Sequence, residues 1–197
     1  MSKIFFTSDE HYGHFNILQY DARPFTDLRE MEETMVERHN SIVGEDDVTY
    51  HLGDFSWRPD QMKFILDKLN GRHILITGNH DRCSHVKPKG KEKWTRYYIE
   101  SGFSEITSYI ITDFPGLGRC MMSHFPLLTV ESEKFKDRYV NFRVKDLMGC
   151  KWLIHGHVHK MWVQRRHEIN VGCQVRGYSP ILLEQLVASV DFSVDSK

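Results

Sequence analysis

Residues 73–81 read HILITGNHD, an apolar run that ends in a glycine, an amide, an imidazole and a carboxylate. Residues 3–11 (KIFFTSDEH) and 48–54 (VTYHLGD) have the same order, with apolar residues first and polar residues last. Short apolar runs bounded by turn residues are typical of buried strands. Because ligands bind beyond the carboxyl ends of the strands in α/β sheets, we expect these polar residues to form a site there.

Amphipathic segments separate these strand-like runs. The first, residues 27–43, ends before Gly44 and presents its apolar residues on one helical face, namely Leu28, Met31, Met35 and Ile42. The second begins at Pro59, a residue suited to a first helical turn, and ends at Asn70 and Gly71. Strands that alternate with helices in this way predict an α/β sheet.

The second half of the chain predicts mainly strands, at residues 106–112, 119–123, 152–154 and 167–171. A turn at residues 115–118 (PGLG) joins the first two of them. Further helices are expected at residues 135–148 and 182–188. We expect a single domain, residues 1–197, of class α/β, in which two sheets pack together and helices flank them.

Composition excludes several classes of protein. Hydrophobic residues make up 40% and charged residues 27% of the 197 residues, unlike a disordered chain or a coiled coil. Lys and Arg number 26 against 27 Asp and Glu, so any nucleic-acid binding would be local. The four cysteines form no CxxC pair, which indicates free thiols in a reducing compartment.

The ends of the chain and its hydropathy bear on location. The first residues, MSKIFFTSDE, reach an acidic residue before an apolar stretch long enough for a signal peptide. No apolar run approaches the ~20 residues that a membrane-spanning helix needs. We therefore expect a soluble, cytoplasmic protein without membrane association.

Twelve histidines in one small chain make metal binding and acid–base chemistry the main question. The polar residues at the expected strand ends are Asp9, His11, Asp54, Asn79, His80, Asp81, His124, His157 and His159. Such nitrogen and oxygen donors, with no thiolate, suit Mn, Fe, Zn, Ni or Co. One such pair alone, such as Asp9 and His11, is weak evidence of a site. Five motifs in order, each at an expected strand end, are strong evidence.

These motifs resemble the DxH, GD, GNH(D/E), H and GHxH blocks of the calcineurin-like metallophosphoesterases, and they extend over residues 9–159. The resemblance implies a four-layer αββα sandwich with two divalent metal ions at the strand ends. It implies that the first ion is held by Asp9, His11 and His159, the second by Asn79, His124 and His157, and both by Asp54. We expect manganese, with iron, nickel, zinc or cobalt as alternatives.

The same resemblance makes His80 catalytic. Two ions of this kind attract a phosphate group and lower the pKa of a shared water, so that hydroxide attacks phosphorus in line. His80 would then protonate the leaving group or stabilise the equatorial oxygens, and Asp81 would orient its imidazole. Residues 53–58 read GDFSWR, which departs from the GDxVDRG block of serine/threonine protein phosphatases. This favours the small bacterial and phage-type phosphoesterases.

The substrate is less well defined. Arg82, adjacent to the GNHD block, and His14, close to the first ligand pair, are the expected substrate contacts. We expect a small phosphate ester, such as a nucleotide, and a phosphodiester rather than a monoester. One alternative is a nuclease or nucleic-acid end-processing enzyme that uses the basic stretch 82–96, which otherwise is a solvated loop. Another is a non-catalytic scaffold with the same fold.

Overall fold

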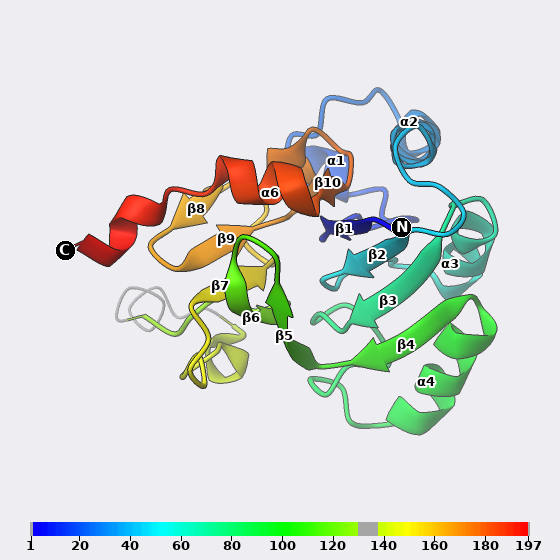
Figure 1. Cartoon of the computed structure of the whole chain (residues 1–197). Helices are drawn as coiled ribbons and strands as arrows, with labels where there is room; N and C mark the ends of the chain where they lie inside the picture. Colours follow the sequence, from blue (N-terminus) through cyan, green and yellow to red (C-terminus); the bar gives the residue numbers. More distant parts are fainter. Residues whose placement is uncertain (1, 130–137, 197) are drawn as a thin grey trace.

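The computed structural model describes residues 2–129 and 138–196 and contains two mixed sheets (Figure 1). The first sheet has the order β10-β1-β2-β3-β4, with bounds β10 (Ile181–Leu182), β1 (Ile4–Thr7), β2 (Val48–His51), β3 (Arg72–Ile76) and β4 (Phe103–Thr107). The second has the order β5-β6-β7-β9-β8, with bounds β5 (Tyr109–Phe114), β6 (Gly118–Ser123), β7 (Trp152–His155), β9 (Glu168–Asn170) and β8 (Gln164–Arg165).

Helices cover the sheets. They are α1 (Ile17–Tyr20), α2 (Leu28–Asn40), α3 (Pro59–Leu66), α4 (Lys91–Glu100) and α6 (Leu183–Ser189), with 3-10 helices η1 (Val140–Phe142), η2 (Cys173–Arg176) and η3 (Phe192–Ser196). Figure 1 shows α2, α3 and α4 along the side of the first sheet that faces away from the second. This arrangement confirms the expected α/β class with two mixed sheets and flanking helices. Within the described ranges, the structure contains no helix both long and apolar enough to cross a membrane.

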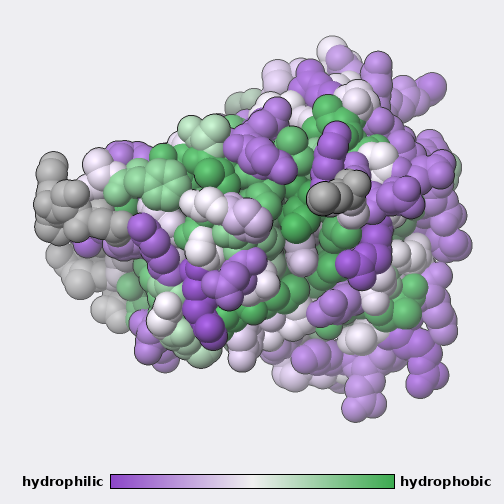
Figure 2. Space-filling model, viewed as in Figure 1, coloured by the Kyte–Doolittle hydropathy of each residue, from purple (hydrophilic) through white to green (hydrophobic). Residues whose placement is uncertain are grey.

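Apolar side chains fill the spaces between these layers. Met31, Met62 and Tyr98, from α2, α3 and α4, belong to a buried cluster with Leu75 of the first sheet. A second cluster joins residues of both sheets, including Phe6, Ile76, Trp152 and Ile154. Figure 2, in the same view as Figure 1, shows the surface of the molecule, with hydrophobic residues across the middle of the visible face and hydrophilic residues around much of its rim. The second cluster, which contains residues of both sheets, therefore holds the two sheets in a fixed position relative to each other.

The register of the first sheet places the motif-bearing loops together. β1, β2 and β3 are parallel neighbours, with Thr7 opposite His51 and His51 opposite Leu75. The chain consequently leaves all three strands at the same edge of the sheet. The loops that follow them carry the first three motifs predicted from the sequence.

The helix expected over residues 27–43 is shorter than predicted. It begins after Asp27, whose Oδ1 accepts a hydrogen bond from the backbone N–H of Glu30 at 2.8 Å. It ends at Asn40, so Ile42 lies beyond its last turn and is 40% exposed. The expected apolar face holds for Met31 and Met35, which are buried, but not for Ile42.

Three further expectations differ from the structure. The strand expected at residues 106–112 is broken at Ser108, where the chain passes from β4 in the first sheet to β5 in the second. Residues 91–96, read as part of a basic loop over 82–96, belong instead to α4 (Lys91–Glu100), which packs Tyr98 into the core. Of the helix expected at 135–148, residues 135–137 lie outside the described residues, and 138–148 contain the short η1.

Candidate metal centre

The loops after β1 and β7 bring together the first group of proposed ligands. The ligand atoms of Asp9, His11 and His159 all lie within 4.8 Å of one another. Asp9 and His11 follow β1 in the first sheet, whereas His159 follows β7 in the second. Asp9 Oδ1 lies 3.7 Å from His159 Nε2. One carboxylate and two imidazoles therefore meet where the two sheets adjoin.

The second group lies beside the first. Asn79 Oδ1 lies 3.1 Å from His124 Nε2 and 2.9 Å from His157 Nδ1. Asp54 Oδ2 lies 3.6 Å from His124 Nε2 and 3.8 Å from His11 Nε2. Asp54 thus stands between the two groups, and all seven residues that the sequence marks as metal ligands are gathered in one place.

Most of the proposed metal ligands have a left-handed backbone conformation. The φ angle is 58° at Asp9, 55° at His11, 57° at Asp54, 71° at His157 and 49° at His159. Such left-handed conformations cost residues with a side chain on the order of 1–3 kcal/mol each, and they cluster at functional sites. The fold therefore retains strain at the residues that point their side chains into this cluster.

A hydrogen bond outside the cluster fixes the orientation of His124. Its Nδ1 lies 2.7 Å from the carbonyl oxygen of Leu52, so this ring nitrogen carries the proton and donates it. The lone pair of Nε2 is then directed toward Asn79 and Asp54. Metal-binding histidines usually have this arrangement, with one nitrogen donating to a carbonyl or carboxylate and the other free to coordinate.

His159 is oriented in a similar way by Asp21, a residue that no sequence motif marks. Its Nδ1 contacts the carboxylate of Asp21 and lies 3.2 Å from Gln174 Oε1, which leaves Nε2 facing Asp9. Burial opposes protonation, but the carboxylates of Asp9 and Asp21 raise the pKa of His159 to about 9. Asp21 lies 138 residues from His159 along the chain, so their contact arises only in the fold.

His11 provides the test of whether a cation fits this site. The side chain is buried, and within the described parts of the chain neither Nδ1 nor Nε2 has a hydrogen-bond partner. An unsatisfied buried polar group costs about 1–3 kcal/mol. Burial, followed by the charge of His159, lowers the pKa of His11 well below its ordinary value, so the ring is neutral. A cation bound to Nε2 would give that nitrogen a partner, and the surrounding imidazoles, carboxylates and amide fit a transition-metal ion.

The pKa values of the two carboxylates of the site are shifted in opposite directions. Burial, followed by the nearby charges of Asp81 and Asp9, raises the pKa of Asp54 well above its ordinary value. At Asp9 burial acts in the same direction, but His159 and His124 outweigh it and the pKa is lowered. A cation beside Asp54 would favour its ionised form. The carboxyl group between the two ligand groups is therefore the one with the most to gain from bound positive charge.

Two glycines allow the loops to approach this closely. A Cβ atom on Gly53 would lie 2.6 Å from His124 Nδ1, and one on Gly156 would lie 2.5 Å from Asp9 Oδ2. Both distances are shorter than any normal contact of a Cβ atom. The absence of a side chain at these positions lets the backbone lie directly against the proposed ligands.

Asp81 has a different contact from the one predicted. Its Oδ2 accepts hydrogen bonds from the backbone N–H groups of Asp54 at 2.9 Å and Gly78 at 2.7 Å, instead of orienting the ring of His80. His80 donates its own backbone N–H to Asp54 Oδ1 at 2.7 Å, and its Nε2 lies 3.9 Å from Asp54 Oδ2. Asp81 is consequently a positioning residue that holds the loop of Asp54.

Of the two residues expected to contact the substrate, one lies beside the metal centre and the other packs on α4. The ring of His14 lies beside the centre, 5.5 Å from that of His11 between centroids. The guanidinium of Arg82 lies over Trp94 of α4, 4.6 Å from the ring centre. Lys87, which the sequence marks only as one cation of the stretch 82–96, donates from Nζ to the carbonyl oxygen of His80 at 2.9 Å. Lys87 therefore supplies positive charge beside the site.

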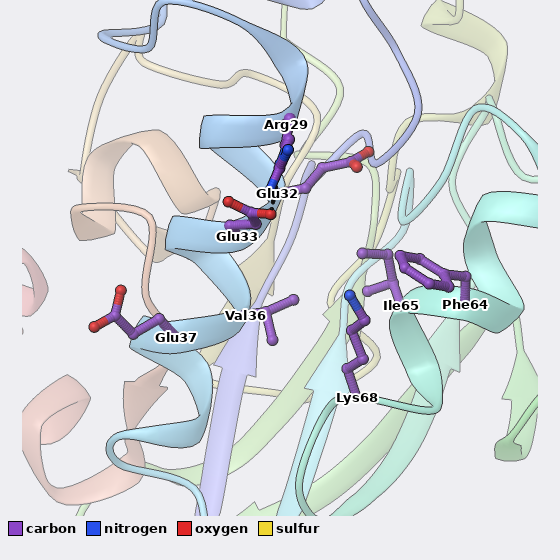
Figure 3. Close-up of a pocket in the computed structure, with 8 residues that line it drawn as sticks. All are labelled: Arg29, Glu32, Glu33, Val36, Glu37, Phe64, Ile65 and Lys68. Atoms are coloured by element: carbon purple, nitrogen blue, oxygen red, sulfur yellow. Dashed lines mark hydrogen bonds and ion pairs between the residues drawn. The ribbon is translucent and has the colours of Figure 1, made fainter.

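A separate groove lies between α2 and α3 (Figure 3). Its volume is about 510 Å³, and its lining includes Val36, Phe64 and Ile65 together with the charged side chains of Glu33 and Lys68. None of its lining residues belongs to the candidate metal centre. The groove is therefore not part of the site that the strand-end residues form.

The fold and the site define an α/β protein with a candidate dinuclear metal centre. No protein-family model matches the chain. The Gene 66 protein of Mycobacterium phage L5 is 31% identical over 191 residues, which cover 90% of this chain and 89% of that protein. The chain therefore belongs to the same family as this phage protein. An uncharacterized protein of Methanocaldococcus jannaschii is 28% identical over 97% of this chain and 93% of its own length.

Solved structures extend the likeness to the fold. The crystal structure of a protein of unknown function from Aquifex aeolicus has 27% identity and a TM-score of 0.68, and the match covers 96% of this chain and all of that one (100%). The crystal structure of a phosphopantetheinyl hydrolase from Mycobacterium tuberculosis matches 73% of this chain and 55% of that chain with 18% identity. Its TM-score of 0.39 is too low to carry an argument.

Proposed function

We propose that this protein is a metal-dependent phosphohydrolase whose site holds two divalent cations. The observation that carries the proposal is the position of Asp54 between two groups of ligand-type side chains. The proposed ligands are Asp9, His11 and His159 for one cation and Asn79, His124 and His157 for the other, with Asp54 shared. His11, whose two buried ring nitrogens both lack a hydrogen-bond partner among the described residues, supports the same assignment.

The donor set combines imidazoles with oxygen ligands and contains no thiolate, which suits manganese, iron, nickel, zinc or cobalt, and of these we propose manganese. When bound, two such cations would draw a phosphate group into the site and make hydroxide available near neutral pH for in-line attack. The protein's own contribution is to hold the ligands in place through strained loops and through hydrogen bonds to the carbonyl oxygen of Leu52 and the carboxylates of Asp21 and Asp81.

His80 is the proposed catalytic residue, and its protonation state favours one of its two expected roles. Burial, followed by the charge of Lys87, lowers the pKa of His80 to about 4. The ring is therefore neutral at pH 7 and cannot act as a ready supply of protons. We propose that its N–H donates a hydrogen bond to an equatorial oxygen of the phosphate, where negative charge increases during the reaction.

We propose a phosphodiester as the substrate, in keeping with the resemblance to the small bacterial and phage-type phosphoesterases. A nuclease remains the second candidate, because Lys87 and the basic residues that lead into α4 lie on the chain directly after His80. A strand-binding enzyme would show an affinity for single-stranded DNA that falls steeply with salt.

The test is a hydrolysis screen on the protein reconstituted with manganese. It compares bis-p-nitrophenyl phosphate, p-nitrophenyl phosphate, cyclic nucleotides and single-stranded DNA, and it measures bound metal by elemental analysis. We expect two metal ions per chain and faster turnover of the diester than of the monoester. A protein that binds no metal stoichiometrically, or that binds it and hydrolyses none of these esters, would contradict the proposal.

A further inference from the structure

Exposed aromatic side chains border the candidate metal centre and have no part in the chemistry proposed above. Trp57, three residues after Asp54, is 45% exposed, and Tyr20 is 72% exposed. Their rings lie 4.1 Å and 6.2 Å, respectively, from that of His14 between centroids. We call His14, Tyr20 and Trp57 the aromatic wall. Large apolar rings left open to solvent beside a catalytic site need a reason, because burial would otherwise stabilise the protein.

Among the described residues, the ring contacts of Trp57 leave one face of its indole uncovered. The His14 imidazole is nearly parallel to it, with an interplanar angle of 10°, and covers the opposite face. The ring of His80 lies 5.0 Å from Trp57 and 6.5 Å from His14. These distances form a nearly right-angled triangle with its corner at Trp57, so His80 lies toward the edge of the indole and not over its free face.

The backbone holds this surface in a fixed position relative to the metal centre. The N–H of Trp57 donates to the carbonyl oxygen of Tyr12 at 2.8 Å, and the hydroxyl of Ser56 donates to the same oxygen at 2.9 Å. The N–H of His14 donates to the carbonyl oxygen of His11 at 3.1 Å. Because these bonds join the loops of Trp57 and His11, a ring that stacks on Trp57 meets a preorganised surface.

We propose that Trp57, backed by His14, stacks the planar base of a nucleotide whose phosphate group occupies the metal centre. This inference rests on the proposed function and specifies its substrate class. Base–aromatic stacking tolerates every base, because each has a π-face, and it requires an exposed aromatic face near the phosphate site. Trp57 meets both conditions through its free face and its contact with His80. A free nucleotide and the end of a nucleic-acid strand present the same chemistry.

The test compares two ligands that differ only in the base. AMP and ribose 5-phosphate share the sugar and the phosphate, and calorimetry measures their affinities for the manganese-loaded protein. We expect AMP to bind at least about fivefold more tightly, the lower range for one base stacked on an aromatic ring. Trp57→Ala should remove this preference without weakening ribose 5-phosphate, and Trp57→Phe should retain most of it. Phe64→Ala, which changes an exposed ring in the separate groove, is the matched control and should retain it fully.

The outcomes separate this inference from the proposed function. If both ligands bind equally well to the wild type, or if Trp57→Ala retains the preference for AMP, the stacking proposal is overturned while the phosphate site stands. If neither ligand binds, the phosphate site and the stacking proposal both fail. Thermal unfolding of each variant verifies that it folds. A short single-stranded oligonucleotide then identifies the source: its affinity falls steeply with salt if the natural ligand is a strand end, and AMP binds more tightly than the oligonucleotide if it is a free nucleotide.

Discussion

Two sets of histidines lie close together in this protein and differ in how their ring nitrogens are used. In the first set, which we call the internal cluster (His39, His51 and His73), His51 Nδ1 lies 2.6 Å from Glu10 Oε1 and its Nε2 lies 3.1 Å from His73 Nδ1. His73 Nε2 lies 3.4 Å from the carbonyl oxygen of Leu69, and His39 Nε2 lies 2.9 Å from that of Asn70.

The second set belongs to the candidate metal centre, and its hydrogen bonding is incomplete. His11 has neither ring nitrogen satisfied among the residues that the structure describes. His124 and His159 each use Nδ1 for a hydrogen bond and direct Nε2 into the site. The difference teaches that burial alone does not identify a metal site: the rings of the internal cluster bond to protein groups, whereas His11, among the proposed ligands, has neither nitrogen bonded within the described residues. Substitutions in the two sets should therefore have different consequences.

The largest effect is expected from Asp54→Asn, because this carboxylate stands between both ligand groups. We expect phosphodiesterase activity to fall by more than ~10⁴-fold, beyond the range for loss of an acid–base residue, together with loss of bound metal. Elemental analysis and steady-state kinetics measure the two losses. Asp67→Asn, at the exposed C-cap of α3, is the matched control and should retain both properties. Normal metal content in Asp54→Asn would contradict its bridging role.

His80→Ala should remove catalysis and leave metal binding in place. We expect kcat to fall by ~10²–10³-fold, the usual loss on removing one hydrogen-bond donor to a developing negative charge, with two metal ions still bound. The reason is that Nε2 of His80 lies at the margin of the site, 3.9 Å from Asp54 Oδ2, and is not among the proposed ligands. Kinetics at saturating substrate and elemental analysis test this. Loss of one metal ion in this variant would instead identify His80 as a ligand.

Manganese should stabilise the wild type and variants of the internal cluster alike. At a concentration about 100 times the Kd, the free energy of unfolding should rise by ~2.7 kcal/mol through mass action. His39→Gln should start from a lower stability but gain the same amount, since it leaves the metal centre unchanged. His11→Gln should gain much less. Urea denaturation with and without manganese measures these differences, and an equal gain in His11→Gln would remove that residue from the site.

Acid should destabilise the metal-free protein through the internal cluster. Burial, above all, lowers the pKa of His51 and His73 to about 3 and that of His39 to about 4. In the unfolded chain histidine titrates near pH 6.5, so unfolding takes up protons below that pH. The stability that depends on neutral histidines is complete above pH 6.5 and is lost as the pH falls toward 4 to 3.

The expected loss from each such histidine at pH 5 is up to about 2 kcal/mol relative to pH 7. Urea denaturation at the two pH values measures it. His39→Gln should show a smaller loss than the wild type because one titrating group is gone. An unfolding free energy that does not change over this range would mean that these histidines are not held neutral in the fold.

The smallest effect is expected from two basic side chains that follow His80 in the sequence, Arg82 and Lys87. Lys87→Ala should raise KM for the phosphodiester several-fold, because Lys87 contacts the His80 carbonyl and adds positive charge beside the site. Arg82→Ala should leave KM nearly unchanged, because the guanidinium packs on Trp94. Michaelis–Menten kinetics of both variants decide between them. The reverse order would restore Arg82 as the phosphate contact expected from the sequence.

The sequence predicts the strand-end motifs because each depends on local order: an apolar run followed at once by polar residues. Residues 3–11, 48–54 and 73–81 all follow this order, and their strands form as parallel neighbours. The α/β class and the paired sheets follow from the same pattern. The positions of the seven proposed ligands could thus be predicted from the sequence.

What the sequence could not predict depends on contacts between distant residues. Nothing near Asp81 indicates that its carboxylate holds the loop of Asp54, since a neighbouring histidine offers a plausible local partner. Helix α4 lacks an apolar stripe long enough to stand out among its lysines, and Gly90 precedes it with a φ of 76°. The break at Ser108 contains neither glycine nor proline, so two short strands resemble one long strand.

Asp9 has a further consequence for the whole molecule. It lies in the loop after β1, and its Oδ2 accepts the backbone N–H of His157, from the loop after β7, at 2.9 Å. This carboxylate thus links the first sheet to the second through a hydrogen bond between their loops. A cation bound in the metal centre should stabilise this link between the sheets. Amide hydrogen exchange at His157 should therefore be slower when the centre is occupied, and it should report occupancy without any substrate.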